Sequence, residues 1–388
     1  MKVDLSILNK EPDYKGSVQH LYIIDEENLL CKTTSGGSVF DIGTIFYIKD
    51  NDIYRTAIRH KIYTGLKNRE YFNEVADFIR EKSLIPEEIL NKIEKNGIET
   101  HHIGIVDSET GKVYENEFPE KLSNLTLVKR FKIIKPKLLN INNKALWNYH
   151  EYHISDNYVI PLENIIRFGI TPQSSIYKKF IKSDKETKEK ILKELGVNEL
   201  YEWQIFDKPV IDFTTKYEPQ DRAVTYQEAC NISGKDREIF QQLYFNCLFC
   251  AVYVFMFFKK YGLTLWDLKL EFAIKDKKLY LVDTIDTDSV RITKKFKNYH
   301  IHFNKQAVRD YYLKYHSDWI EKVNLAKEEA KRKGIPFQKL IPEPPEVNKE
   351  FFNNQSEKLK YLVDLIIFKN SNVAIDEILE KEINFLYK

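Results

Sequence analysis

Apolar and polar residues alternate in several segments near the N-terminus, as they do in half-buried β-strands. Residues 18–25 and 28–33 alternate in this way around an acidic turn, DEEN, and residues 101–106 and 126–134 follow. We interpret residues 1–60 as strands. The pattern therefore predicts an antiparallel sheet in the N-terminal part of the chain.

Segments with a helical period carry recognisable start and stop signals. One helix is predicted over residues 68–82, and the next begins at Pro86, a favoured first-turn residue, and ends at Gly97. A long apolar helix is expected between a cap at Asp236 and a stop at Gly262. These signals predict helices inserted among the strands.

Residues 157–168 predict a further strand. A capping box that begins at Ser183 predicts a helix over residues 185–195, and a second box at Thr225 predicts one over residues 226–232. The central part of the chain therefore mixes strands with helices.

The last part of the sequence combines one hairpin with helices. Apolar alternation predicts strands over residues 268–274 and 279–285, joined by a turn at 275–278. Further elements are a helix over 305–333, a proline-bearing linker at 336–345, and terminal helices over 354–369 and 373–386. The chain is thus α+β, with an N-terminal antiparallel sheet lobe (1–135), a central sheet-and-helix lobe (136–300) and a helical C-terminal region (301–388).

Composition narrows the class of ligand. The chain has 388 residues, 43% of them hydrophobic, so two or three lobes with sizeable cores are expected. Its 60 basic residues nearly balance 58 acidic ones, so the net charge of +2 creates no field that attracts nucleic acid or an anionic membrane. We expect small-molecule substrates.

The cysteines and the apolar run favour packing over chemistry. Cys31, Cys230, Cys247 and Cys250 lack the spacing of a disulfide framework or a zinc ribbon. Residues 243–258 are strongly apolar but shorter than the roughly 20 residues of a membrane span, which indicates a core or subunit-interface helix. With no apolar signal segment at the N-terminus, we expect a soluble, cytoplasmic protein, and leave self-association open.

Candidate chemistry begins at the predicted hairpin. Glu271 lies on its first strand, Asp283 ends the returning strand, and Ser289 and Arg291 follow shortly after. Carboxylates at a strand end suit Mg²⁺ that bridges phosphates. The alternative is a solvated acidic turn, and spacing alone does not decide between the two.

Two further clusters contain phosphate-binding residue types. In TTKYEPQD, Lys216 and Glu218 share one face of an extended segment, and Asp221 follows. They suit phosphate and metal, or form a surface ion pair that contributes little. A third group, Arg167, Ser174 and Ser175, suits a phosphate monoester. We find neither a P-loop nor a Rossmann glycine motif.

These segments together resemble the SAICAR synthetase (phosphoribosylaminoimidazole-succinocarboxamide synthase) family over residues 14–312. Each matching stretch is weak by itself, but their order is specific. They are YKGSVQHLY, SVFDIGT, GIETHHIG, LVKRF, NYVIPLENIIRFGITPQSSIYKKF, KPVIDFTTKYEPQDRAVTYQEA, LKLEF, LYLVDTIDTDSVRI and KQAVRDYY.

The resemblance implies a fold with an ATP cleft between two sheet lobes, and a ligase that uses ATP and Mg²⁺. Such enzymes join a phosphorylated ribonucleotide carboxylate to the amine of the amino acid aspartate through an acyl phosphate. By position, the resemblance assigns catalysis to Lys216 and Asp221, ATP binding to Ser17, Glu218 and Glu271, and metal binding to Asp283 and Glu218. It assigns binding of the nucleotide 5′-phosphate to Arg167, Ser174, Ser175, Ser289 and Arg291.

The sequence also departs from the family pattern. Gly36-Gly37 replaces an Asp-Arg pair, and KDND, from Lys49 to Asp52, replaces a flexible Pro-Gly-Lys-Gly loop. The ATP and metal half is expected to be kept and the substrate half rewritten, with Lys49 or Arg55 as a substitute cation. We therefore expect a ligase with its ordinary or a shifted substrate. The alternatives are a non-catalytic nucleotide-binding homologue and a small-molecule phosphotransferase.

Overall fold

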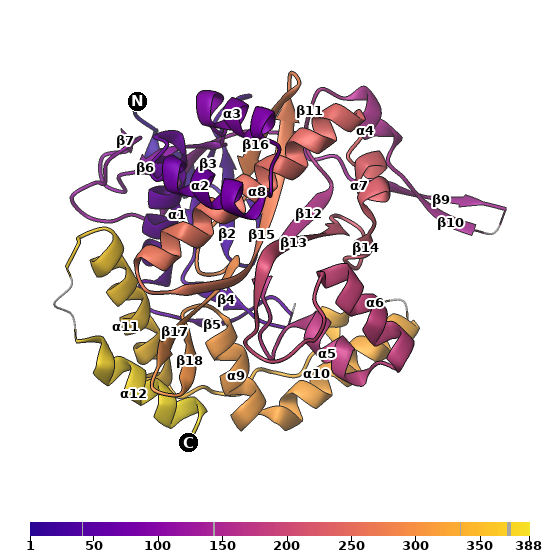
Figure 1. Cartoon of the computed structure of the whole chain (residues 1–388). Coiled ribbons are helices and arrows are strands. Elements are labelled where there is room, and N and C mark those ends of the chain that lie inside the picture. The colour runs from indigo at the N-terminus through magenta and orange to yellow at the C-terminus, as the bar shows by residue number, and fades with distance from the viewer. Residues whose placement is uncertain (41, 143, 334, 371–373) are drawn as a thin grey trace. The chain divides into compact units, whose positions relative to one another are not determined.

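The structure is a computed structural model that describes residues 1–40, 42–142, 144–333, 335–370 and 374–388 (Figure 1). Asp41 of the SVFDIGT stretch and Val373, the expected start of the last helix, lie outside the described residues. The chain divides into two compact units. Unit 1 comprises Met1–Lys61, His102–Lys129 and Asp286–Lys388, and unit 2 comprises Ile62–His101 and Arg130–Ile285.

Unit 1 contains the expected N-terminal antiparallel sheet. Its strands follow the order β1 (Tyr14–Lys15), β2 (Gln19–Ile23), β3 (Asn28–Thr33), β8 (Leu125–Lys129), β6 (His102–Val106) and β7 (Val113–Tyr114). The short helix η1 (Leu5–Asn9) lies against this sheet, whose apolar face buries Leu30, Val106 and Leu127. The strands expected here are confirmed, although β8 ends at Lys129 rather than at residue 134.

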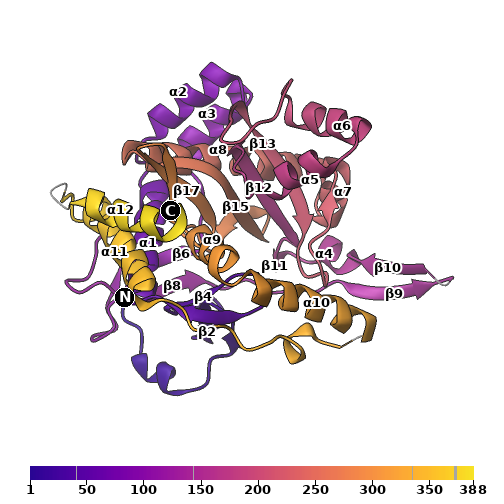
Figure 2. The same ribbon diagram turned by 90° about the horizontal axis from the view of Figure 1, so that it is seen from below.

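The remainder of unit 1 is a helical layer with two small hairpins. The hairpins pair β4 (Gly36–Ser38) with β5 (Thr44–Tyr47), and β17 (Val290–Phe296) with β18 (Tyr299–His302). The helices are α9 (Gln306–Tyr315), α10 (Ser317–Lys333), η2 (Phe337–Lys339), α11 (Lys349–Ile366) and α12 (Ile375–Leu386). Helices α11 and α12 lie side by side (Figures 1 and 2).

The single helix expected over residues 305–333 is wrong, because His316 interrupts it. His316 ends α9 with φ −139°, and its amide donates to the carbonyl of Tyr312. The break brings Tyr312 and Trp319 together in a core cluster, with ring centroids 5.3 Å apart. Tertiary packing therefore outweighs the continuous helical period.

The interpretation of residues 1–60 as strands is also wrong, because α1 spans Asn51–Lys67. This helix begins in unit 1, and its last residues belong to unit 2. Its amphipathic pattern is hidden because Arg55, Arg59 and His60 are buried polar residues that occupy core positions. Asn51 and Asp52 lie in its first turn, so KDND leads directly into a helix.

Unit 2 is built on antiparallel strands in the order β14 (Ala223–Val224), β13 (Ile205–Thr215), β12 (Leu162–Gly169) and β15 (Thr264–Lys275). Strands β11 (Asn157–Val159) and β16 (Lys278–Val282) also pair with β15. One strand was expected over residues 157–168, but two form. The segment at Pro161 separates them because proline lacks the N–H that a ladder needs.

Helices α2 (Phe72–Lys82), α3 (Glu87–Asn96) and α8 (Arg237–Lys260) pack together, with α8 on β15 (Figure 1). Helix α8 is long and apolar enough to cross a membrane by length and composition alone. It is mostly buried, and Cys247 and Cys250 on it are buried, free thiols. The expected core helix is confirmed, and burial raises the pKa of both thiols.

The other helices of unit 2 are α4 (His150–Ile154), α5 (Ser175–Lys182), α6 (Lys185–Leu195) and α7 (Tyr226–Ile232). Thr225 caps α7 and Asp236 caps α8, as expected. Ser183 does not cap α6: Asp184 accepts from the amide of Thr187 instead. Helix α2 begins at Phe72 rather than at residue 68, because Tyr71 adopts a left-handed conformation.

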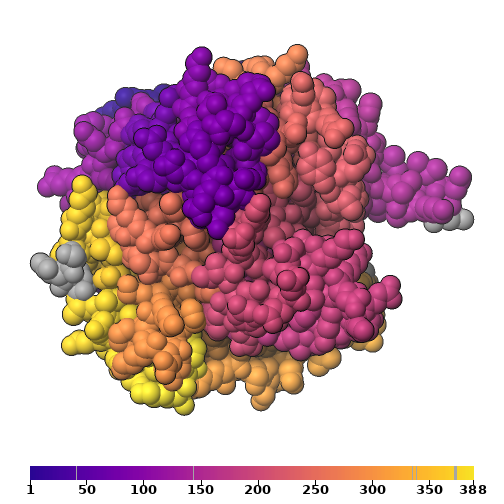
Figure 3. All heavy atoms as spheres, in the orientation of Figure 1, coloured from indigo at the N-terminus to yellow at the C-terminus, as the bar shows by residue number. Residues whose placement is uncertain are grey.

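A hairpin for which the sequence analysis predicted no element projects from unit 2. It joins β9 (Lys137–Ile141) to β10 (Lys144–Asn148) and stands clear of the rest of unit 2 (Figure 3). Leu138, Ile141 and Leu146 on this hairpin are about half exposed.

Candidate active site

Unit 2 gathers lysines and carboxylates on one face of its sheet. Lys216, directly after β13, places its Nζ 2.5 Å from Oε1 of Glu271 on β15. Lys269 on the same strand lies 2.9 Å from Glu271 and 2.6 Å from Glu163. Lys269 and Glu271 share a face because side chains alternate along a strand. The β12–β15 register places Ile165 opposite Lys269, so Glu163 belongs to the same face.

Glu271 is only 3% exposed, which excludes the solvated acidic turn. Burial raises its pKa, but the neighbouring charges of Lys269 and Lys216 outweigh that effect and lower the pKa below the usual value. Burial also lowers the pKa of Lys269, and the surrounding carboxylates more than reverse this. The cluster is therefore a charged, mutually neutralised network.

Asp283 lies beside Glu271, and the two carboxyl groups are hydrogen-bonded to each other. Burial and the charge of Glu271 raise the pKa of Asp283. A hydrogen bond between two carboxyl groups requires a proton, and these shifts place it on Asp283.

The backbone around these side chains is unusual. Asp283 has φ +65° and Tyr217, next to Lys216, has φ +75°. The hydroxyl of Tyr63 donates to the carbonyl of Asp283 at 2.8 Å and so supports this conformation. Left-handed backbone at non-glycine residues is costly and concentrates at functional sites.

Glu218 makes different contacts from its neighbour Lys216. The hydroxyl of Tyr149 donates to Glu218 at 2.6 Å, and Arg222 lies 3.2 Å away. Burial and this hydrogen bond raise the pKa of Tyr149 well above its usual value. Asp221, in the turn between them, is exposed. The expected surface ion pair between Lys216 and Glu218 does not form. Lys216 pairs with Glu271, and Glu218 pairs with Arg222.

Arg167 is paired with carboxylates rather than directed into open space. Its guanidinium lies 2.9 Å from Asp212 and 3.7 Å from Asp267. Ser174 is buried at the start of α5, and among the described residues its Oγ has no hydrogen-bond partner. Ser175, the first residue of α5, is exposed.

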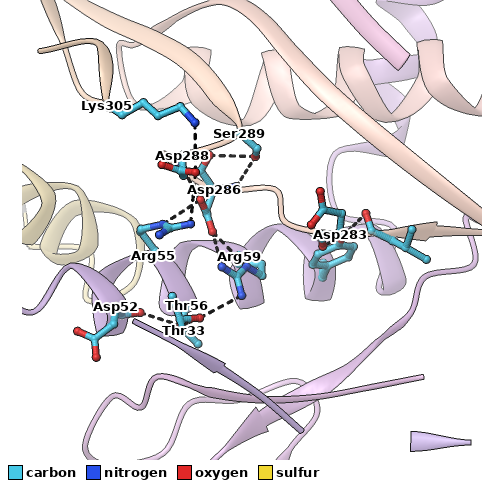
Figure 4. Close-up of polar contacts among 12 residues, drawn as sticks. Thr33, Asp52, Arg55, Thr56, Arg59, Asp283, Asp286, Asp288, Ser289 and Lys305 are labelled. Atoms are coloured by element: carbon cyan, nitrogen blue, oxygen red, sulfur yellow. Dashed lines mark hydrogen bonds and ion pairs between the residues drawn. The ribbon is translucent and has the colours of Figure 1, made fainter. Parts of the chain in front are cut away.

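Unit 1 holds the segment after Asp283 by a buried ion network (Figure 4). Asp286 accepts from Arg55 at 3.2 Å and from Arg59 at 2.5 Å, and all three are buried. Burial raises the pKa of Asp286, but the two guanidinium groups outweigh it and lower the pKa to about 2. Ser289 bonds to the backbone of Asp286.

Of the expected site residues, unit 2 brings Lys216, Glu271 and Asp283 into contact. It places Glu218 in an ion pair with Arg222 and Arg167 in an ion pair with Asp212. Ser174 lies at the start of α5. Ser17, Ser289 and Arg291 belong to unit 1. Ser17 is exposed, and its carbonyl accepts from Thr44, whereas Arg291 lies on β17.

Several members of these clusters escaped sequence reasoning. Lys269 is two residues before Glu271, so strand alternation alone could have placed it on the same face. Arg55 and Arg59 are four residues apart on α1, a spacing that places both on one helix face. Recognising them required α1 to be predicted. Tyr149 and Glu163 carried no local signal.

Comparisons with known proteins agree with this fold and identify the family. The family model of SAICAR synthetase matches residues 13–326. A relative in Archaeoglobus fulgidus assigned to this activity is 28% identical over 279 residues, which cover 70% of this chain and 78% of the relative. The phosphoribosylaminoimidazole-succinocarboxamide synthase of Thermoplasma acidophilum is 27% identical over 68% of this chain and 82% of its own length.

Solved structures show the same fold at lower identity. A SAICAR synthase structure has a TM-score of 0.56 at 16% identity and covers 93% of this chain and 96% of its own. The SAICAR synthase from Saccharomyces cerevisiae complexed with SAICAR has a TM-score of 0.53 at 18% identity, with the same shares of each chain covered.

Family match and relatives together place the chain among ATP-dependent ligases that form carbon–nitrogen bonds. It belongs to the SAICAR synthetase family. That family acts in purine biosynthesis and ligates a carboxylate with aspartate.

Proposed function

We propose that this chain uses ATP and Mg²⁺ to form an amide between a nucleotide carboxylate and an amino-acid amine such as that of aspartate. The contact among Lys216, Glu271 and Asp283 carries the proposal. An ammonium group beside carboxylates is suited to neutralise a phosphate while an acid holds the metal. In this assignment, which follows the family resemblance, Lys216 and Asp221 serve catalysis, and Ser17, Glu218 and Glu271 bind ATP. We also propose that the protein acts in the cytoplasm, as an enzyme of purine biosynthesis.

The carboxyl pair fits a divalent cation. Two adjacent carboxyl groups share a proton here, and a cation can replace that proton and remove the repulsion between them. Within the described ranges, no three His, Cys, Asp or Glu side chains form a ready cage. Mg²⁺ commonly uses one or two carboxylates and completes its shell with water and phosphate oxygens. We assign Asp283 as its ligand, with Glu218 as the second candidate.

The N-terminus of α5 fits the nucleotide 5′-phosphate. Ser174 offers a buried hydroxyl that lacks a partner among the described residues, and the helix start offers free amide donors. Ser175 follows it, and Arg167 requires a substrate oxyanion to compete with Asp212 and Asp267. The family resemblance also assigns Ser289 and Arg291, which belong to unit 1, to the nucleotide substrate.

The test is ADP release from purified protein with ATP, Mg²⁺, carboxyaminoimidazole ribonucleotide and L-aspartate, with each component omitted in turn. We expect turnover that requires all four. Turnover only with another carboxylate or amine would show that the substrate has shifted with the Gly36-Gly37 replacement. A phosphorylated product without an amide would indicate a phosphotransferase, and ATP binding without turnover would indicate a non-catalytic homologue.

A further inference from the structure

Helix α11 packs onto the two segments in which this chain departs from the family pattern. The ring of Phe46 stacks on Phe352 of α11, with centroids 5.4 Å apart. The hydroxyl of Ser356, also on α11, donates to the carbonyl of Lys49 at 2.8 Å. Helix α11 lies beyond residues 13–326, which the family model matches. Helix α11 therefore contacts the part of the chain that carries these departures.

Phe46 also lies against Gly37. A Cβ on Gly37 would lie 2.1 Å from the Phe46 ring, so a side chain at this position would require that ring to move.

A cavity of about 40 Å³ lies beside Gly37 and is closed on one side by α11. Its volume accommodates roughly three water-sized spheres, which is the size of a carboxylate head group. Three cations line it, from Arg55, Lys305 and Lys358, together with the carboxylate of Asp288. Each cation also has a carboxylate partner: Asp286 for Arg55, Asp288 for Lys305 and Glu382 for Lys358. The rest of the polar lining comes from the side-chain amides of Asn51, Asn304 and Gln355 and from Thr287.

Lys358 is the buried member of this set. It is 1% exposed, and it donates to the carbonyl of His302 at 2.8 Å and to Glu382 at 2.5 Å. An ammonium has three donors, so these acceptors, within the described part of the chain, leave one. Burial lowers the pKa of Lys358 despite the charge of Glu382, so a second anion nearby would stabilise the ammonium.

Asn304 contributes an amide to the cavity wall. Its side chain is hydrogen-bonded to His302, and this bond raises the pKa of that histidine, against the larger lowering effect of burial. Only the NH2 end of the Asn304 amide can donate to an anion, because the oxygen is an acceptor.

We propose that this cavity binds a carboxylate group of a substrate, and that Lys358 of α11 is its principal cationic contact. Lys305 and Gln355 line the same space and add a partly exposed cation and an amide. Lys358 thus supplies a positive charge to the cavity that Gly37 also lines. The inference rests on the ligase activity proposed above, and the carboxylate belongs either to the nucleotide or to the amino acid.

The first test compares Lys358→Gln with Lys360→Gln in the full chain. Lys360 is a matched control because it lies on the same helix in an exposed ion pair with Asp364. Lys358→Gln should raise KM for one carboxylate substrate by roughly tenfold or more and leave KM for ATP within about twofold. A rise for L-aspartate assigns the cavity to the amino acid, and a rise for carboxyaminoimidazole ribonucleotide assigns it to the nucleotide.

A second variant covers the case in which Lys358→Gln fails to fold, since that change leaves Glu382 without its cation. Lys305→Gln removes a partly exposed charge paired with Asp288 at 3.3 Å. It should raise the same KM. If Lys305→Gln, or a cooperatively folded Lys358→Gln, leaves both carboxylate KM values unchanged, the cavity binds no substrate and the inference is wrong.

Calorimetric titration with succinate and with L-aspartate separates this inference from the proposed function. If either probe binds to the wild type and to Lys360→Gln but not to Lys358→Gln or Lys305→Gln, the cavity binds a carboxylate. This conclusion holds even if the ligase assay shows no turnover. If the wild type turns over but neither variant changes a carboxylate KM, the proposed ligase function stands and the cavity is not a substrate site. Absence of binding by both probes and by carboxyaminoimidazole ribonucleotide overturns the inference.

Discussion

Asp283 combines three properties that rarely coincide at one residue. Its backbone is left-handed, its carboxyl group is hydrogen-bonded to Glu271, and its pKa is raised by burial and by that neighbour. A residue that served only to pack would have no need of them. The combination makes Asp283 the residue whose replacement is most informative.

Asp283→Asn is expected to abolish Mg²⁺-dependent ATP use, because an amide binds a divalent cation far more weakly than a carboxylate does. The melting temperature should stay within a few degrees, since asparagine is nearly isosteric and also tolerates positive φ. Steady-state ADP release and a thermal melt measure the two effects.

The matched control is Asp276→Asn, at the exposed turn of the same hairpin, where φ is +50°. It should retain full activity. Unchanged turnover in Asp283→Asn would remove Asp283 from the site.

At the scale of elements, α1 is anchored to the segment after β16 by buried charge. Arg55 and Arg59, one turn apart on α1, both contact Asp286. Asp286 in turn accepts from the amide of Asp288 at 2.8 Å, which shapes the loop that carries Asp288 and Ser289. A single carboxylate therefore joins a helix to a loop of the candidate substrate site.

Removing one partner of this network should be strongly destabilising, because it leaves Asp286 buried with less compensation. We expect Arg59→Ala to lower the free energy of unfolding by about 3–5 kcal/mol, measured by urea denaturation. Arg80→Ala, which breaks a surface cluster with Glu87 and Glu94, should cause a much smaller loss. Equal losses would contradict the role assigned to burial.

His302, on strand β18, is expected to make the stability of the protein depend on pH. Burial, with the nearby charges of Arg291 and Lys358, lowers the pKa of His302 to about 3. Below pH 6.5 the unfolded chain binds a proton that the folded chain does not, so stability falls as pH decreases from about 6.5 toward 3. Above that window the histidine contributes no pH dependence.

The loss from His302 should reach on the order of 3 kcal/mol by pH 4. Urea denaturation from pH 7 to pH 4 measures it, and His302→Gln should flatten the slope while His153→Gln, at an exposed position, should not. An unaltered slope in His302→Gln would assign the acid sensitivity to other groups.

At the scale of the whole molecule, the C-terminal helices are part of the core of unit 1. Phe351, Phe352 and Tyr311 belong to one buried cluster with Phe46 from the N-terminal hairpin. The cluster joins segments about 300 residues apart in sequence. The region beyond the family match is therefore an integral part of unit 1.

A chain that ends at Asn348 should lose cooperative unfolding of unit 1, because it exposes the aromatic cluster to water. Near-ultraviolet circular dichroism and dye binding to exposed apolar surface measure this loss. Removal of exposed Lys388 alone should have no effect. A truncated chain with native spectra would show that α11 and α12 are appendages.

Much of the fold could be predicted from local pattern. Strand alternation placed β2, β3, β15 and β16, and caps at Thr225 and Asp236 placed the starts of α7 and α8. Local signals failed where long-range contacts decide. Arg55 and Arg59 disguise α1 as polar because Asp286, 227 positions after Arg59, neutralises them. His316 breaks a helical period for the packing of Trp319.

The sequence by itself determined the α+β class and the buried α8, because these depend on local periodicity and residue type. Its resemblance to the SAICAR synthetase family is confirmed by the family match, whereas the roles of Lys216, Glu271 and Asp283 stay predictions. Only the tertiary structure decided that Lys216 pairs with Glu271 rather than with Glu218. It also decided that Gly37, Lys305 and Lys358 line one cavity. Electrostatic energy depends on distance in space and on burial, and neither quantity is written in the order of residues along the chain.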